Sequence, residues 1–334
     1  MIISRLSVRA AAVLAAGTLF LTGCGSSVTP TSAPSGSAAA VTLTNCGREV
    51  VADGVPAAAV GLHPAQTELL LRLGLADRLA GQAQAKAQAL PADIAPLAKD
   101  IPVIGDVKPP SREDLLAVEP DFVYSPTTYE FTAEQGFASI EQLEQAGAAV
   151  YVAGGGCQER RMTGEVRDLF TDLENLGAIF RVEDAAAELV SSSQAELDQV
   201  ATALSGVDRL RVAQVYVDGT TLQAIGAGVE YDILRQAGAD SVYTPDQPAF
   251  AEFFAATITP ESLAAEQPEA LVFAVYDEQH EAATRKYLTT TFPDLPAVRE
   301  DRLIAVSTAD VFPGTLGNIS AVRRIAERLY PDAF

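Results

Sequence analysis

The chain has 334 residues, of which 48% are apolar, and its formal net charge is −21. Nucleic acid and anionic bilayer surfaces repel so acidic a protein, which argues against either as the main partner. An acidic surface also serves solubility, so the charge says little else about function.

The N-terminal segment has the order of a cleavable export signal. Arg5 and Arg9 precede a charge-free, mostly apolar run over residues 10–20, and the sequence LTGC follows at 21–24. The run has about a dozen residues, whereas a membrane-spanning helix needs roughly 20. LTGC resembles the lipobox of bacterial lipoproteins, in which the cysteine receives a lipid. We expect a signal peptide over 1–23 and lipidation of Cys24; the alternative is an ordinary secretory signal with a coincidental cysteine.

The segment after Cys24 is almost entirely Gly, Ser, Thr, Pro and Ala as far as residue 40. This composition cannot bury enough apolar surface to fold, so we expect a flexible tether over 24–40. Anchor and tether together predict an extracytoplasmic body, attached to the cell membrane through the lipid. About 290 residues remain, enough for two domains. Removing the two signal arginines takes the charge from −21 to −23.

Lipidation of Cys24 leaves two cysteines, Cys46 and Cys157. In an oxidising compartment, two remaining cysteines most simply form a disulfide. Two separate buried thiols are the alternative. A metal site is a weaker interpretation, because the sequence has two histidines and no CxxC spacing.

From residue 41 onward, short β-branched runs alternate with amphipathic stretches, which is typical of an α/β protein with parallel strands. The expected strands are 58–62, 79–82, 121–125, 148–153, 211–218, 221–225, 270–276 and 302–307. The clearest helices are 65–73, which ends at Gly74, and 318–329, which precedes Pro331.

A weak internal repeat is the clearest sign of the architecture. Residues 111–124 (SREDLLAVEPDFVY) align without gaps with residues 259–272 (TPESLAAEQPEALV). Each copy begins with a hydroxyl residue suited to capping a helix, has an acidic first turn, and reaches an apolar strand after a proline. The repeat predicts two similar lobes; the alternative is that helix-to-strand transitions generally look alike.

One long helix is expected between the two copies. Residues 183–204 carry apolar side chains at intervals of three or four residues and contain no Gly or Pro. At about 1.5 Å per residue, this helix would be about 33 Å long. We expect an N-terminal lobe over 41–182, this connecting helix over 183–205 and a C-terminal lobe over 206–334.

An anchor, a tether, two similar lobes and a long connector together resemble the substrate-binding lipoproteins of ABC importers, in particular the class for iron-siderophores, haem and cobalamin, the class III periplasmic binding proteins. The resemblance covers residues 41–330 and rests on QTELLLRLG (66–74), IPVIG (101–105), SREDLL with EPD (111–116 and 119–121), and DRLI (301–304). NCGREV (45–50) with GC (156–157) is also similar to a lipoprotein subset with an extra disulfide. Some members of that subset are proposed to take up a deazaflavin-cofactor precursor.

The resemblance implies a ligand cleft between the lobes, an ABC permease and its ATPase as partners, and no cofactor. Strand ends and helix starts offer free backbone N–H groups in such a cleft, which favours anionic ligands. The candidate ligand-binding residues are His63, Gln66, Thr67, Tyr129, Arg160, Arg161, Tyr216, Tyr276, His280, Phe312 and Asn318.

Structural alternatives accompany these candidates. His63 precedes Pro64 and suits a helix cap. Arg160 and Arg161 could bind a carboxylate or phosphate, or form surface ion pairs. Tyr129 could simply pack against its neighbours.

The resemblance also implies one acidic docking residue in each lobe, which would engage arginines of the permease. The matching residues are Glu68 and Asp232, with Glu230 as a close competitor of Asp232. The helix dipole alone also favours acids at helix starts, so the pattern has a second explanation.

Other functions compete with transport. A hydrolase would need a nucleophile elbow such as GxSxG, which the sequence lacks, so no catalytic residue is expected. A receptor for free metal ions would gather several His and carboxylate ligands, whereas His63 and His280 fall in different lobes. A ligand-sensing lipoprotein would share every sequence feature with a transport protein.

The expected ligand is a ferric siderophore or a similar chelate. Cobalamin, haem, the deazaflavin precursor and a free metal ion are the alternatives. The absence of Trp weakens haem and cobalamin slightly, because a large planar ligand would have to stack on Tyr or Phe.

Overall fold

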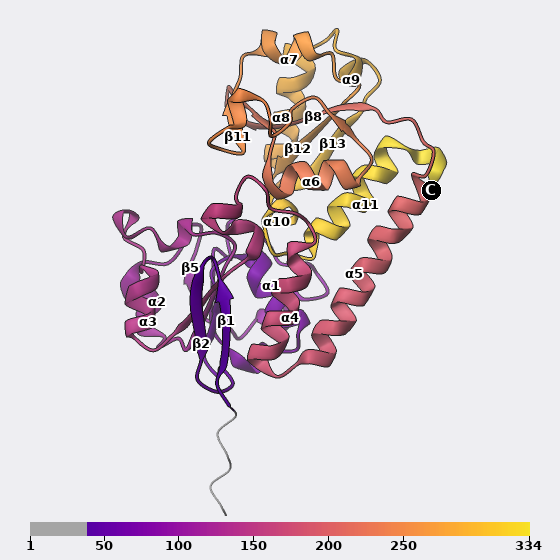
Figure 1. Ribbon diagram of the computed structural model, residues 1–334. Coiled ribbons are helices and arrows are strands. Elements are labelled where there is room, and N and C mark those ends of the chain that lie inside the picture. The colour runs from indigo at the N-terminus through magenta and orange to yellow at the C-terminus, as the bar shows by residue number, and fades with distance from the viewer. Residues whose placement is uncertain (1–38) are drawn as a thin grey trace, which may run out of the picture. The chain divides into compact units, whose positions relative to one another are not determined.

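Two β-sheets organise residues 39–334, the part of the chain that the computed structural model describes (Figure 1). These residues belong to a single compact unit. The predicted signal peptide, Cys24 and nearly all of the predicted tether lie outside the described residues. Within them, no helix combines the length and the apolar character needed to cross a membrane.

The first sheet has five parallel strands in the order β5-β4-β3-β6-β7. Its strands are β3 (Ala59–Gly61), β4 (Leu79–Ala83), β5 (Val103–Gly105), β6 (Phe122–Ser125) and β7 (Ala149–Val152). Its helices are α1 (Pro64–Arg72), α2 (Arg112–Ala117), α3 (Ile140–Gln145) and α4 (Asp168–Phe180). Every residue of β3, β6 and β7 is buried, as expected for parallel strands covered on both faces. The four predicted first-lobe strands are confirmed, and β5 was not predicted.

An N-terminal hairpin, which was not predicted, packs against the edge of this sheet. It consists of β1 (Val41–Asn45) and β2 (Arg48–Ala52), paired antiparallel. The Asn45 side chain donates to the Val152 carbonyl over 2.7 Å and accepts from the Val152 amide over 2.8 Å. The Cys46–Cys157 disulfide, predicted from the cysteine count, joins the turn of this hairpin to the segment after β7.

The second sheet has the order β11-β9-β8-β12-β13, with β10 also paired to β8. Its strands are β8 (Arg211–Asp218), β9 (Thr221–Ile225), β10 (Asp240–Ser241), β11 (Ala255–Thr257), β12 (Ala270–Val275) and β13 (Leu303–Ser307). Strands β8, β12 and β13 are parallel, whereas β9 is antiparallel to β8 and β11. The two lobes are therefore similar in their central strands and differ at this edge, because a two-residue turn at Gly219 reverses the chain between β8 and β9.

The helices of the second lobe are α6 (Gly228–Gln236), α7 (Pro260–Glu266), α8 (Glu278–Thr291), α9 (Pro296–Arg299), α10 (Thr308–Val311) and α11 (Gly317–Leu329). Helix α7 and strand β12 form the second copy of the sequence repeat, and α2 with β6 form the first. Ser111 accepts a hydrogen bond from the Asp114 amide at the start of α2, and Thr259 accepts one from the Ser262 amide at the start of α7. The hydroxyl caps that the repeat predicts are therefore present in both lobes.

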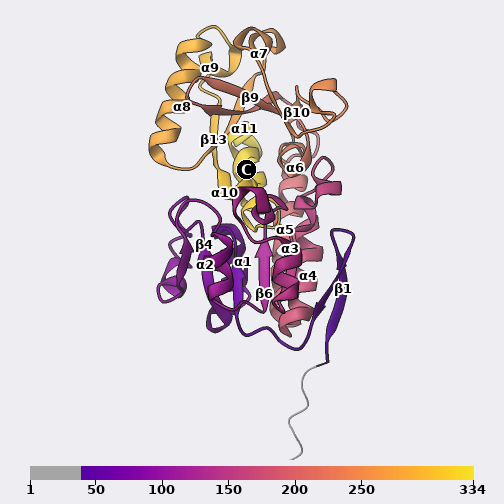
Figure 2. The same ribbon diagram turned by 90° about the vertical axis from the view of Figure 1, so that its left-hand side faces the viewer.

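The predicted connector is α5 (Glu183–Ala203), which packs against α4 of the first lobe and against α11 and α6 of the second. Figures 1 and 2 show this helix running alongside both lobes. One apolar cluster continues from the helices of the first sheet, across α5, to α11 and the second sheet. The two lobes thus share a core on this side, which restricts how far they can move apart.

Candidate ligand-binding site

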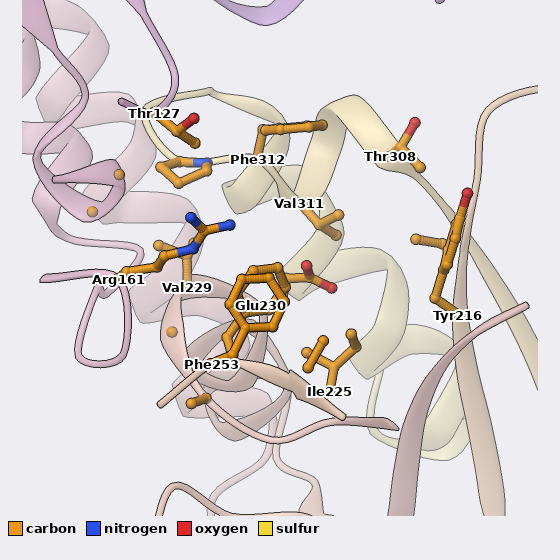
Figure 3. A pocket seen from close by; sticks show the side chains of 18 of the residues that line it. Thr127, Arg161, Tyr216, Ile225, Val229, Glu230, Phe253, Thr308, Val311 and Phe312 are labelled. Atoms are coloured by element: carbon orange, nitrogen blue, oxygen red, sulfur yellow. The ribbon is translucent and has the colours of Figure 1, made fainter. Parts of the chain in front are cut away.

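A cavity of about 470 Å³ lies between the two lobes (Figure 3). The first lobe contributes Thr127 after β6, Gly155 and Gly156 after β7, and Arg161. The second lobe supplies the remaining wall, from β8, β9, β12, α6, β11 with the segment before it, and the segment around α10. Small-molecule sites commonly have about 300–1,000 Å³, so the cavity suits a compact organic ligand.

Apolar side chains make up most of the cavity wall, and polar groups interrupt it at a few places. The apolar and aromatic members are Ile225, Ala227, Val229, Phe253, Phe254, Ala255, Ala274, Val311, Phe312 and Pro313. The polar members are Thr127, Tyr216, Gln223 and Thr308, and the charged ones are Arg161 and Glu230. Such a wall can bind an apolar ligand body and fix its orientation through a few polar contacts.

Arg161 is the basic side chain of the cavity wall. Its guanidinium carbon lies 4.6 Å from the ring centre of Phe253 and 5.2 Å from that of Phe254. Burial lowers the pKa of Arg161, and nearby Glu130 partly offsets this, yet the guanidinium stays charged at neutral pH. No ion pair neutralises it among residues 39–334, so its N–H groups are available to a ligand anion.

Glu230 is the acidic side chain of the cavity wall, in the first turn of α6. Figure 3 shows its carboxyl group and the Arg161 guanidinium both pointing into the cavity, from different lobes. Gln214 of β8 donates a hydrogen bond of 2.6 Å to Glu230 Oε2. Burial raises the pKa of Glu230 to about 8, because that single hydrogen bond does not compensate for lost hydration.

The first-lobe loops that reach the cavity are held closely against one another. A Cβ on Gly156 would lie 1.8 Å from the Pro126 carbonyl oxygen, so only glycine allows this approach. Glu130 accepts hydrogen bonds from Ser125 Oγ over 3.1 Å and Thr127 Oγ1 over 2.7 Å, which fixes the loop that carries Thr127. The Cys46–Cys157 disulfide begins one residue after Gly156.

Two predicted ligand residues connect the lobes instead of lining the cavity. The His63 ring lies 4.5 Å from the ring of Phe312, and Gln66 Nε2 donates to the carbonyls of Pro313 and Gly314. His63 Nδ1 also accepts from the Ala65 amide at the start of α1, the capping role given as its alternative. Burial lowers the pKa of His63 to about 4, so it is neutral at physiological pH. Phe312 lines the cavity as well as contacting His63.

Three other candidates have contacts within their own lobe. Thr67 is buried with its hydroxyl 3.5 Å from the Gly61 carbonyl. Arg160 forms an ion pair of 2.7 Å with Asp168, the structural alternative weighed for it. Tyr129 is 50% exposed and packs edge-on against Phe137. Within residues 39–334, these three side chains do not line the cavity.

The remaining candidates lie in the second lobe. Tyr216 lines the cavity. Tyr276 stacks on His280 with ring centres 4.1 Å apart, and His280 Nε2 lies 2.7 Å from the Val217 carbonyl oxygen. Asn318 donates to the backbone carbonyls of Asp310 in α10 and of Phe312. Of the eleven candidates, the structure thus brings Arg161, Tyr216 and Phe312 to the cavity.

The two proposed docking residues differ in accessibility. Glu68 on α1 pairs with Arg72 over 2.7 Å and keeps 15% of its side chain exposed. Asp232 is only 3% exposed, and it accepts hydrogen bonds from the Val166 amide, Arg235 and Gln236. A docking residue must be accessible to its partner, whereas the buried Asp232 carboxylate ties α6 to the segment before α4.

Sequence reasoning missed several residues at the lobe boundary. Phe253 and Phe254 lie beneath Arg161, and the two adjacent aromatic residues were the available signal. Gln88, in the loop after β4, bonds to Ser307 and Thr308 of the second lobe. No periodic pattern marks Gln88, because its role depends on a partner more than two hundred residues away.

Comparison with known proteins gives the same architecture. A model of the periplasmic binding protein family matches residues 60–308. A periplasmic binding protein from Veillonella parvula has a TM-score of 0.76 at 22% identity, covering 89% of this chain and 99% of its own. An ABC-type Fe³⁺-hydroxamate transport system protein from Saccharomonospora viridis has a TM-score of 0.70 at 25% identity, covering 86% and 98%. A periplasmic haem-binding protein from Pseudomonas aeruginosa has a TM-score of 0.66 at 22% identity, covering 84% of this chain and 95% of its own. No curated protein sequence matches significantly.

Proposed function

The chain belongs to the periplasmic binding protein family, and from this premise we propose that it is the substrate-binding lipoprotein of an ABC importer. It captures a ferric siderophore or a similar chelate and delivers it to a membrane permease. The observation that carries the proposal is the cavity of about 470 Å³ whose wall is shared by both lobes. A ligand held there contacts both lobes at once, so its capture can be sensed by a partner that contacts both.

The composition of the cavity wall favours a chelate over a bare metal ion. Iron and similar ions need several His, Cys or carboxylate ligands, whereas Glu230 is the one such side chain on the wall. Among residues 39–334, the group close enough to hold a metal is Cys46, Cys157 and Glu159, and its two sulfurs are bonded to each other. An organic chelate supplies the metal ligands itself and offers an apolar body with polar edges, which matches this wall.

The Fe³⁺-hydroxamate protein from Saccharomonospora viridis supports the same ligand class. Arg161 provides the positive charge for an anionic edge of the chelate, with Phe253 and Phe254 holding its guanidinium in place. Haem remains the second candidate, because the Pseudomonas aeruginosa relative binds haem. Phe253, Phe254 and Tyr216 would then have to supply the stacking surface.

The proposed location is the outer face of the cell membrane, with Cys24 as the lipidated residue. The family name itself places such proteins outside the cytoplasm. The Cys46–Cys157 disulfide agrees with an oxidising compartment, where such bonds persist. The proposed partners are an ABC permease and its ATPase, with Glu68 as the first-lobe docking residue. A ligand-sensing lipoprotein would share these features, and neighbouring permease and ATPase genes would favour transport.

The decisive experiment is to purify the protein from its native host without denaturation and identify the bound molecule by mass spectrometry. Recovery of a ferric chelate at a molar ratio near one supports the proposal. Recovery of haem, or tight binding of an unrelated compound with no iron chelate, contradicts the ligand class. Calorimetric titration of the chelator-treated protein with ferric ion alone is the control, and tight binding there would contradict the chelate.

A further inference from the structure

Glu230 places a carboxyl group at the cavity wall, and the buried Gln214 holds one of its two oxygens. Gln214 is 1% exposed, and its Nε2 donates to Glu230 Oε2 over 2.6 Å. Its own Oε1 is buried without a hydrogen-bond partner. Among residues 39–334, the other carboxyl oxygen of Glu230 accepts no hydrogen bond from a side chain. This second Glu230 oxygen, on a residue of the cavity wall, is therefore available to a donor on the ligand.

The cavity also lacks a positive charge beside Glu230. The titratable side chains that share its wall are Arg161 and Tyr216, and neither forms a hydrogen bond or ion pair with Glu230 in the described protein. Arg161 instead stacks over Phe253 and Phe254. On the rest of α6, Arg235 is paired with Asp232. The site therefore has one unneutralised cation on the first lobe and one carboxyl group without a cation on the second.

We propose that Glu230, positioned by Gln214, forms a subsite for a protonated amine of the ligand. The ammonium group donates to the Glu230 oxygen that Gln214 leaves free, which supplies the missing charge at the cavity wall. This inference rests on the proposed function and narrows its ligand class: the captured chelate carries an amine toward α6 and an anionic edge toward Arg161.

The raised pKa of Glu230 agrees with this assignment. Its pKa is about 8, because burial penalises the carboxylate and no cation compensates. An ammonium group in hydrogen-bond contact favours the carboxylate, so the pKa of Glu230 falls when the ligand binds. A neutral acid would not discriminate between an amine and its uncharged derivative, whereas a carboxylate paired with an ammonium does.

The test compares two probes that differ at one group. One is a ferric trihydroxamate chelate with a terminal primary amine, and the other is the same chelate with that amine acetylated. By isothermal titration calorimetry at about pH 8, the amine chelate should bind the wild-type protein at least about tenfold more tightly. In Glu230→Gln this preference should disappear, while Glu278→Gln, an exposed change of the same kind on α8, should retain it. Circular dichroism verifies that each variant is folded.

The outcomes separate this inference from the proposed function. Equal binding of the two chelates to the wild-type protein overturns the amine subsite and leaves the ferric-chelate function standing. If neither chelate binds, the trihydroxamate class is overturned, and the subsite is decided with benzylammonium as the probe. Chemical shifts of the protein should then move with benzylammonium concentration in the wild type and in Glu278→Gln. Equal titration curves in Glu230→Gln overturn the subsite independently, and a loss of binding in that variant supports it.

Discussion

The imidazole of His63 and the phenyl ring of Phe312 lie 4.5 Å apart across the boundary between the two lobes. Phe312 belongs to a segment of the second lobe that packs against the first, where the Tyr124 hydroxyl donates to the Gly314 carbonyl over 3.1 Å. His63 is buried there and also caps α1. Its protonation state is therefore coupled to the stability of the contact between the lobes.

We expect His63 to contribute a loss of stability as the pH falls, which appears as a difference between the wild type and a variant without this histidine. Its pKa is about 4 in the folded protein, against 6.5 for an unperturbed histidine. Between these values the unfolded chain binds a proton at His63 that the folded protein does not. The contribution is thus complete above about pH 6.5 and is lost as the pH falls toward 4, by about 3 kcal/mol in total. Urea unfolding between about pH 7.5 and about pH 4.5 measures it.

The matched variant for this prediction is His63→Asn, because asparagine can cap α1 and does not titrate. Its unfolding free energy should fall less with acid than that of the wild type. Asp172 titrates in the opposite sense, since burial raises its pKa to about 7, but it is present in both proteins and cancels in the comparison. Identical pH profiles of the two proteins would show that His63 is not responsible.

Removing the Cys46–Cys157 disulfide should lower the free energy of unfolding by about 4 kcal/mol. The bond closes a loop with a sequence separation of 111, and the entropy of the unfolded chain rises when so long a loop is opened. The comparison is between the wild type and the double variant Cys46→Ala with Cys157→Ala in urea. Peptide mapping without reduction verifies the bond first. A reductant should destabilise the wild type and leave the double variant unchanged; the same loss in both would contradict the assignment.

The repeat shows why much of the fold could be predicted from the sequence. Glu119 and Gln267 correspond in the alignment, and both adopt left-handed conformations, with φ of 47° and 48°, directly before a proline. A hydroxyl cap, an apolar helix face and a proline before a strand are local signals, so they survive in a single sequence. Strand β9 was predicted with its exact bounds, whereas β10 and β11 were missed, because they have only two and three residues and carry no periodic pattern.

The site could be predicted only in part, for a different physical reason. The strand-end loops were placed correctly as a region, and Arg161, Tyr216 and Phe312 do line the cavity. His63 and Gln66 look equally suitable in the sequence, but the segment after α10 covers them. Which polar residue meets the cavity and which meets the other lobe depends on contacts between distant segments, and a local pattern does not carry that information.

Replacing Arg161 should weaken the binding of an anionic ligand. In Arg161→Gln the cavity loses its guanidinium and the cation–π contact with Phe253, so affinity for a ferric chelate with a free carboxylate should fall about tenfold or more. Arg160→Gln is the control, because Arg160 is paired with Asp168 and lies outside the cavity wall. Calorimetry on both variants measures the difference. Equal affinity in Arg161→Gln and the wild type would remove Arg161 from the ligand site.

Charge reversal at Glu68 should abolish uptake of the ligand by cells while leaving the affinity of the purified protein intact. Burial is the main cause that raises the pKa of Glu68, and nearby Asp310 and Asp93 add to it. These two acids would offset the repulsion between a lysine at this position and Arg72, so the fold should tolerate the change. The control is Glu261→Lys, which makes the same charge change at an exposed position on α7.

Asp232 does not offer an equivalent test in the second lobe. Its carboxylate is buried and holds the Val166 amide, so a lysine at this position would break contacts between the lobes and lower the melting temperature whatever the docking surface is. Glu68→Lys is therefore the variant that tests docking to the permease. Radiolabelled ferric chelate measures uptake, and calorimetry measures affinity. Normal uptake in Glu68→Lys rejects this residue as a docking site, whereas lost uptake with lost affinity would place Glu68 in ligand binding instead.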